Sequence, residues 1–264
     1  MDISFNEQPL GVLTEENLKK FWGNVTNIKG VSEGRCQIIE VEGERALQVT
    51  FPKGKLSPSL GGASWRYRFD KTYEELTVEY KVRLSSEFDF VRGGKLPGLC
   101  GGSYPRGGAR EKESDGFSAR IMWRELGALM QYVYRFDESS TRKSGQDFLW
   151  TSDKRMGPTV TADLWKQLQN RTTKIEGLEY LSPNVWHTLK THIKMNMPGQ
   201  ENGKIISSFD EREVLNIDLS LRKDASFGID SFQFVTYFGG NDETWVPIKD
   251  EQIFFKDFRF ISGE

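Results

Sequence analysis

A strict alternation of apolar and polar residues over positions 76–84 constrains the fold of this chain more than any other feature. The apolar positions are Leu76, Val78, Tyr80, Val82 and Leu84, and the positions between them are Thr77, Glu79, Lys81 and Arg83. Side chains of a β-strand point alternately to its two faces, so a period of two predicts a strand with one buried face. A chain with many such strands must build sheets that cover one another.

Similar segments recur along most of the chain, whereas helical patterns are rare. We predict further strands at Ala46–Phe51, Ser64–Phe69, Phe117–Arg124, Leu129–Phe136, Trp186–Asn196, Ile205–Phe209, Phe232–Phe238 and Ile253–Ile261. Turn sequences such as Asn202-Gly203 and Gly239-Gly240-Asn241 separate some of them. Thr14–Trp22, with Thr14 as the N-cap, and Asp163–Asn170 are predicted as short helices.

Many strands with few helices favour an all-β fold, and specifically a β-jelly-roll sandwich of two antiparallel sheets. The chain has 264 residues, of which 37% are hydrophobic and 12% aromatic, which suffices for a core. No linker, internal repeat or low-complexity block divides the sequence. We therefore expect residues 1–264 to form a single domain.

The charge balance limits the partners of the chain. Its formal net charge is −2 at pH 7, so affinity for an acidic polymer would need a local basic cleft rather than bulk charge. Nucleic-acid binding is not expected. No apolar run reaches the length of a membrane span, and the first residues lack the basic-then-apolar pattern of a signal peptide.

Metal and disulfide chemistry have little support in the sequence. Cys36 and Cys100 are the only cysteines, so one disulfide is possible, whereas cysteine-based zinc and iron–sulfur sites are excluded by number. His187 and His192 are the only histidines, and their odd offset places them on opposite faces of a regular strand. We interpret both as structural and expect neither a metal nor another cofactor.

A glycine-rich segment, FVRGGKLPGLCGG, occupies residues 90–102, and two Gly-Gly pairs flank Lys95 within it. A Gly-Gly pair after a strand lets the backbone turn sharply and approach a ligand closely, which would hold Lys95 at the rim of a groove. The alternative is an ordinary glycine-rich loop with a solvated lysine, and spacing alone favours that alternative. The segment is not a P-loop, because the required spacing and the Ser/Thr after the lysine are missing.

The two strands on either side of Leu126 carry a second group of candidate residues. A hairpin centred there places Arg120 opposite Tyr132 and Ser118 opposite Tyr134. Directly opposed residues of an antiparallel pair point to the same face, so these four side chains should form one patch. One interpretation is a polar outer face with a cross-strand cation–π pair. The other is a chemical site, because arginine can pair with a carboxylate and tyrosine can transfer a proton.

Several motifs extend beyond this patch: GGKLPGL at 93–99, FSARIMWR at 117–124, YVY at 132–134, Lys194-Met-Asn196 after Trp186, Pro198-Gly-Gln-Glu-Asn-Gly203 and Phe238-Gly-Gly240. Together, over roughly residues 65–260, they resemble polysaccharide lyase family 14. That family includes alginate lyases of marine molluscs and a glucuronate-cleaving lyase of algal viruses. The chain departs from the family pattern at residues 207–214, SSFDEREV, where a tryptophan and Asp-Gly are usual. This departure bears on substrate choice more than on reaction type.

The resemblance implies a jelly roll with a basic cleft across one sheet. It also implies the catalytic residues, which are Lys95, Ser118, Arg120, Tyr132 and Tyr134. We expect substrate-binding cations at Arg66, Arg92 and Arg124. The implied reaction is metal-independent β-elimination of an acidic polysaccharide, either poly-mannuronate alginate or glucuronan, which gives unsaturated uronate ends. A substrate of this class favours a secreted protein.

Each catalytic residue has an expected role in this reaction. Lys95 or Arg120 would neutralise the uronate carboxylate, and Ser118 would orient that carboxylate or a tyrosine. One tyrosine, with Tyr134 preferred over Tyr132, would remove the C5 proton. We expect the two cations to lower the pKa of this tyrosine, because a nearby positive charge favours the phenolate.

Other functions are possible from the residues alone. A non-catalytic module that binds acidic polysaccharides is the main alternative, with stacking platforms that would come from Trp65, Trp123, Trp150 and Trp245 unless these form the core. A glycoside hydrolase would need a carboxylate pair, and no strand carries a suitable run of acidic residues. A Ser-His-Asp triad would need a nucleophile-elbow motif, which the sequence lacks.

Overall fold

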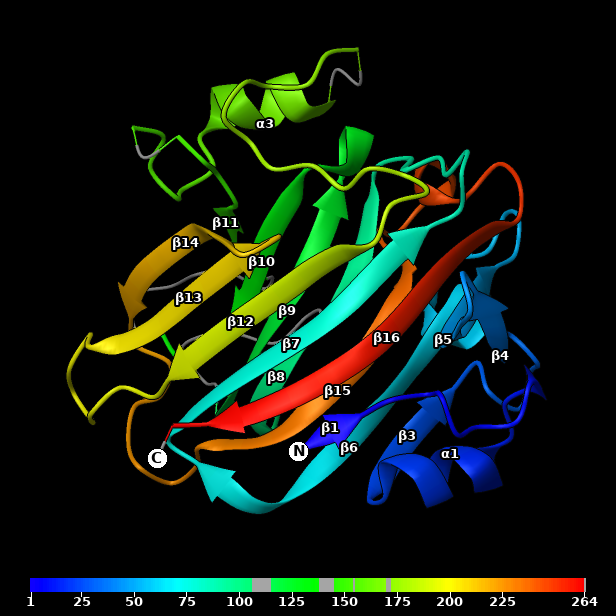
Figure 1. Ribbon diagram of the computed structural model, residues 1–264. Helices are drawn as coiled ribbons and strands as arrows, with labels where there is room; N and C mark the ends of the chain where they lie inside the picture. Colours follow the sequence, from blue (N-terminus) through cyan, green and yellow to red (C-terminus); the bar gives the residue numbers. More distant parts are fainter. Residues whose placement is uncertain (106–114, 138–144, 154, 170–171, 264) are drawn as a thin grey trace.

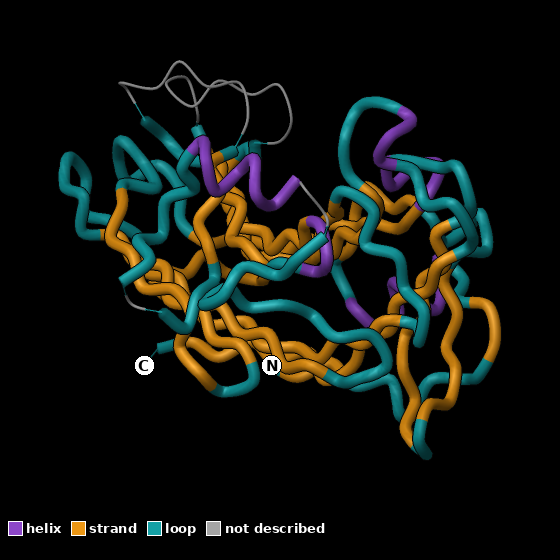
Figure 2. Tube along the Cα trace, turned by 90° about the horizontal axis from the view of Figure 1, so that it is seen from above, coloured by secondary structure: helices purple, strands orange, loops and turns teal. Residues whose placement is uncertain are grey.

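The computed structural model describes residues 1–105, 115–137, 145–153, 155–169 and 172–263 (Figure 1). Within them, two antiparallel sheets pack face to face, and Figure 2 shows these two layers of strands from above. This arrangement confirms the predicted all-β sandwich with a few short helices.

The larger sheet has the order β14-β13-β12-β7-β16-β5-β4-β2, and β1 pairs with β16 beside this path. Its strands are β1 (Asp2–Ile3), β2 (Gly11–Val12), β4 (Cys36–Val41), β5 (Glu44–Phe51), β7 (Glu75–Leu84), β12 (His187–Lys194), β13 (Gly203–Phe209), β14 (Arg212–Leu219) and β16 (Glu251–Ser262). The second sheet has the order β11-β10-β9-β8-β15-β6-β3. Its strands are β3 (Val25–Lys29), β6 (Gly62–Tyr73), β8 (Gly93–Gly102), β9 (Gly116–Arg124), β10 (Leu129–Tyr134), β11 (Gln146–Leu149) and β15 (Ile229–Phe238).

The helical elements are short. They are α1 (Glu15–Trp22), α2 (Ser57–Gly61) and α3 (Ala162–Gln169), with 3₁₀ turns η2 (Glu125–Gly127) and η3 (Glu243–Trp245). The Thr14 hydroxyl caps α1 by accepting a hydrogen bond from the Asn17 amide, as predicted. The second predicted helix corresponds to α3, although Asn170, at its predicted end, lies outside the described residues.

The core lies between the two sheets and is rich in aromatic side chains. Trp65 stacks on Phe234 with ring centres 3.9 Å apart, and Trp22 packs edge-on against Trp65. Three tryptophans considered as sugar platforms, Trp65, Trp123 and Trp150, are at most 1% exposed. These three side chains therefore belong to the interior, because a ring that is fully buried in the sandwich has no face left for a sugar.

The segment around Lys95 is a strand, so its interpretation as a glycine-rich loop is wrong. β8 is a central strand of the second sheet, between β9 and β15. Gly94 and Gly98 are required by close packing rather than by a turn. A Cβ on Gly94 would overlap the ring of Trp123 and lie 2.5 Å from the Tyr237 carbonyl oxygen. β4 and β14 were also not predicted, although Leu215, Ile217 and Leu219 of β14 alternate with polar residues.

The outer face of the second sheet, which points away from the core, is covered at one end. Ala128, Met130 and Leu149 form a small apolar cluster there with Leu168 of α3. In Figure 1, α3 lies beyond the ends of β9 and β10, and it overlies strands in Figure 2. The burial of this cluster anchors α3 on the sheet.

The remaining structural predictions have mixed outcomes. Cys36 and Cys100 are both buried and both free, so the possible disulfide does not form. His187 packs on Phe209 and its ring lies 2.7 Å from Asp210, whereas His192, on the opposite face of β12, contacts Thr77 and Glu75. Both histidines are held by neighbouring side chains, as the structural interpretation requires. Over the described ranges, no helix is long and apolar enough to cross a membrane.

Candidate active site

The register of β9 and β10 brings the predicted residues together. Tyr132 pairs with Arg120 and Tyr134 pairs with Ser118, which confirms the predicted hairpin. The reversal occurs at η2, where Leu126 has a φ of 58° and is followed by Gly127 at 91°. All four side chains therefore point to the same face of the sheet, the outer one.

β8 adds Lys95 to the same face. Lys95 pairs with Met122 of β9, two residues from Arg120 and therefore on the same side of the strand. A register shift between Leu96 and Gly98 then places Gly98 opposite Arg120. Gly98 has no side chain to stand between Arg120 and its neighbours, and a Cβ there would lie 2.7 Å from the Arg120 Cα.

The resulting site consists of two cations against two aromatic rings. The Lys95 Nζ lies 3.5 Å from the ring centre of Tyr132 and 2.6 Å from the Met122 sulfur. The Arg120 guanidinium carbon lies 5.7 Å and 5.6 Å from the ring centres of Tyr132 and Tyr134. Lys95 is 8% exposed and Arg120 is 3% exposed, so little water screens their charges.

Neither of these cations forms an ion pair with a carboxylate among the described residues, although the charge of Asp147 acts on Lys95 from farther away. The Nε atom of Arg120 is buried and has no hydrogen-bond acceptor within that part of the chain. Burial lowers the pKa of Lys95 well below its usual value, and the positive charges of Arg120 and Arg124 lower it further. Buried positive charge without compensation is costly, so a ligand carboxylate would stabilise this site strongly.

The two tyrosine hydroxyls lie 3.2 Å apart, and the rings meet edge-to-face. The Tyr132 hydroxyl also accepts a hydrogen bond from the Gly145 amide at 3.1 Å. Burial raises the pKa of Tyr132 far above its usual value, and the hydrogen bond to Tyr134 adds to the rise, although Arg120 opposes it. For Tyr132 the expectation of a lowered pKa is therefore wrong, because loss of hydration outweighs the nearby cation.

The other predicted residues lie along the same sheet but have partners. Arg124 donates to both carboxylate oxygens of Asp147 at 2.9 Å. Arg66 donates to Asp230 at 2.8 Å and lies over the ring of Tyr104. Arg92 lies 3.9 Å from Glu125 and over the ring of Trp245. These three arginines are thus charge-compensated, unlike Lys95 and Arg120.

Ser118 is placed on the predicted face but is fully buried, and its hydroxyl donates to the Pro105 carbonyl at 2.8 Å. Its observed contact therefore fixes the backbone at Pro105. Met122, which sequence reasoning did not select, packs with Tyr132 and Tyr134 and contacts Lys95. The signal was its even spacing from Ser118 and Arg120, which places it on the same face.

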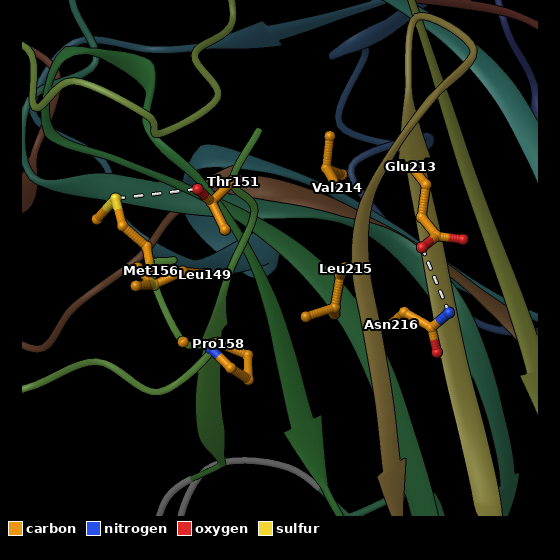
Figure 3. Close-up of a pocket in the computed structure, with 9 residues that line it drawn as sticks. Leu149, Thr151, Met156, Pro158, Glu213, Val214, Leu215 and Asn216 are labelled. Atoms are coloured by element: carbon orange, nitrogen blue, oxygen red, sulfur yellow. Dashed lines mark hydrogen bonds between the residues drawn. The ribbon is translucent and has the colours of Figure 1, made fainter. Parts of the chain in front are cut away.

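Among the described residues, neither a metal site nor the cavity between the 149–158 segment and β14 involves this patch. No group of three His, Cys, Asp or Glu side chains is arranged to hold a metal ion in the described part of the chain. A cavity of about 270 Å³ lies between Leu149–Pro158 and β14 (Figure 3). Its wall includes Met156, Leu215 and Asn216, and it contains none of the candidate catalytic residues.

Comparisons with solved structures identify proteins that share this fold. A mutant of the alginate lyase Aly36B in complex with alginate trisaccharide superposes with a TM-score of 0.78 and 20% identity, covering 100% of this chain and 98% of that one. A marine alginate lyase from Aplysia kurodai has a TM-score of 0.75 and 21% identity, with 100% and 98% coverage. The alginate lyase vAL-1 from Chlorella virus has a TM-score of 0.69 and 20% identity, with 97% and 100% coverage. At these identities the likeness shows the shared fold.

No curated protein sequence matches the chain. The family model for polysaccharide lyase 14, however, matches residues 40–258, which include most strands of both sheets and every candidate site residue. The chain therefore belongs to the polysaccharide lyase 14 family.

Proposed function

We propose that this chain is a polyuronate lyase that cleaves by β-elimination at the patch of Lys95, Arg120, Tyr132 and Tyr134. In this reaction the C5 proton of a uronate is removed and its electron pair forms a C4–C5 double bond. The bond from C4 to the glycosidic oxygen breaks, and that oxygen takes up a proton. The products are one chain with an unsaturated uronate end and one chain with a restored hydroxyl.

The observation that supports this proposal best is the pair of buried cations without a carboxylate partner in the described part of the chain. Removal of the C5 proton places a second negative charge next to a carboxylate that is already charged. Lys95 and Arg120 are positioned to neutralise that charge, and preorganised electrostatics of this kind is often the largest contribution to catalysis. The flanking arginines are less suited to this role, because their charges are already balanced by Asp147, Asp230 and Glu125.

The tyrosine pair supplies the proton transfer. Tyr132 remains protonated because burial raises its pKa, and its hydroxyl accepts from Gly145. Its own proton can then be donated to the Tyr134 oxygen at 3.2 Å. A hydrogen bond to the charged form favours that form, so Tyr132 would stabilise a Tyr134 phenolate. We assign Tyr134 as the base that removes the C5 proton and then protonates the leaving oxygen, and Tyr132 as its partner.

The substrate class follows from this chemistry and from the relatives. Mannuronate and glucuronate place the C5 hydrogen and the C4 oxygen on the same ring face, so one residue can serve both steps. They differ at C2, away from the reacting atoms, and the proposal covers poly-mannuronate alginate and glucuronan alike. Alginate is the substrate named for the similar structures. The two cations can neutralise the carboxylate, so a chelator should leave the activity intact.

The proposal is tested by incubating the protein with alginate, poly-mannuronate and glucuronan and following the ultraviolet absorbance of unsaturated products. Wild-type protein should produce them from at least one polymer. Tyr134→Phe should lower kcat at least about a hundredfold, since general acid–base catalysis contributes that much or more, while polymer binding and the melting temperature stay close to wild type. Tyr132→Phe is the matched variant and should retain more activity. If both variants keep near-full turnover, tyrosine catalysis is ruled out and Lys95 becomes the candidate base.

A further inference from the structure

A second hollow adjoins the candidate active site on the side of β11. It has a volume of about 360 Å³ and is lined by Asp147, Thr159 and Trp165, among other residues. This volume falls within the range of sites that bind small ligands. Asp147 pairs with Tyr132 across β10 and β11, so the hollow begins one strand away from the catalytic patch. Gly145, which also lines the hollow, donates its amide to the Tyr132 hydroxyl.

Trp165 is presented to this hollow by an anchored helix. On α3, Leu168 is 4% exposed and packs with Met130 and Leu149 of the sheet, while the half-buried Trp165 packs against the same apolar cluster. The Arg124 guanidinium lies 4.7 Å from the centre of the Trp165 ring. The ring is therefore held by Arg124 and by the apolar cluster, which lowers the entropy lost when a ligand stacks on it.

The charges around the hollow favour hydroxyl groups over carboxylates. Arg124 uses one nitrogen to contact both oxygens of Asp147, so the pair has no net charge. Asp147 still has lone pairs that can accept hydrogen bonds from sugar hydroxyls. A ligand carboxylate in the same place would meet the Asp147 charge at short range. Lys95 and Arg120, by contrast, have no carboxylate partner in the described residues and suit an anion.

We propose that this hollow is a sugar subsite, in which Trp165 stacks on the pyranose ring that adjoins the cleaved uronate on the side away from the broken bond, and Asp147 with Arg124 binds its hydroxyls. This inference rests on the proposed lyase function. It implies that the chain recognises the cleaved residue by its carboxylate and the neighbouring residue by its ring and hydroxyls. The subsite therefore accepts a sugar without a carboxylate, such as a neutral hexose, beside the uronate that is cleaved.

The test compares Trp165→Ala with wild-type protein on poly-mannuronate or glucuronan oligosaccharides of increasing length. On oligosaccharides long enough to reach the subsite, kcat/KM should fall about tenfold, which corresponds to about 1.4 kcal/mol. On the shortest oligosaccharide that wild type cleaves without occupying the subsite, the two proteins should be equal. Trp165→Phe should recover part of the loss, because it retains an aromatic face.

Trp186→Ala is the matched control. Trp186 also lies under a cation, with the Lys256 Nζ 4.6 Å from its ring centre, but Lys256 belongs to β16 in the larger sheet. This variant should cleave all lengths like wild type. Equal rates of Trp165→Ala and wild type on every length would overturn the subsite, and so would an equal loss on every length, because that is the effect of a distorted fold. Absence of unsaturated product from wild-type protein would instead refute the lyase function itself.

Discussion

Lys95 lies in an environment that is unusual for a lysine. The residue is 8% exposed, and its amine lies against the Tyr132 ring with Arg120 and Arg124 as positive neighbours. Burial and these like charges lower its pKa well below its usual value, so the amine loses its charge at a lower pH than a surface lysine would. A bound uronate carboxylate would oppose this shift, because an opposite charge favours the protonated amine.

This residue gives a prediction about pH. If the charged form of Lys95 binds the substrate carboxylate, kcat/KM falls as the pH rises through the lowered pKa. Lys95→Arg carries a cation that stays protonated, so its alkaline decline should move to higher pH. The measurement is kcat/KM against pH for wild type, Lys95→Arg and Lys95→Ala. A wild-type rate that rises with pH where Lys95 deprotonates, together with inactive Lys95→Arg, would identify the neutral amine as the base instead.

At the scale of elements, β8 depends on glycines that keep it close to its neighbours. Gly94 lies against the ring of Trp123 and the Tyr237 carbonyl, and Gly98 lies against the backbone of β9. The strand can carry Lys95 between β9 and β15 only because these positions have no side chain. β8 therefore needs glycine at Gly94 and Gly98 for packing, and it also carries the candidate catalytic residue Lys95.

We expect Gly94→Ala to destabilise the fold. The added methyl would overlap Trp123 and lie 2.5 Å from backbone, and overpacking of this kind costs about 1–3 kcal/mol. Gly157→Ala is the control, because nothing lies within 4 Å of its added Cβ, and its effect should be within about 0.5 kcal/mol. Chemical denaturation of the three proteins measures this difference. An unchanged free energy of unfolding for Gly94→Ala would show that β8 can move away from its neighbours.

At the scale of the whole molecule, the net charge does not indicate the cationic patch at Lys95 and Arg120. The formal net charge is −2, yet Lys95 and Arg120 lie together without a carboxylate partner in the described residues. The arginines that flank them are paired with Asp147, Asp230 and Glu125. Attraction of an acidic polymer therefore depends on a small number of cations near the centre of one sheet rather than on the overall field.

This distribution predicts a weak dependence of KM on salt. A plot of log KM against log salt should have a slope of about one to two, because each cation that contacts a polyanion adds about one unit. Lys95→Ala should lower the slope by about one. Lys190→Ala removes the same charge from β12 in the other sheet, where the side chain is 45% exposed, and should leave the slope unchanged. Equal slopes for both variants would mean that Lys95 does not meet the substrate charge.

Features that depend on local periodicity can be predicted from the amino-acid sequence. The alternation in β9 and β10, with a turn at Leu126, was enough to place Arg120 opposite Tyr132 and Ser118 opposite Tyr134. The Thr14 cap and the sandwich of antiparallel sheets followed in the same way, because the period of side chains along one segment is a property of that segment.

Features that depend on distant neighbours arise only in the folded protein. β8 was not recognisable as a strand, because the need for glycine at Gly94 comes from its close contacts with Trp123 and Tyr237, which are remote in sequence. Loss of hydration around Tyr132 reversed the expected direction of its pKa. Trp165 lines the hollow beside β11 only because α3 docks on β10 and β11. Trp65, Trp123 and Trp150, by contrast, are buried in the core. Burial and hydration are properties of the assembled sandwich, and no single segment encodes them.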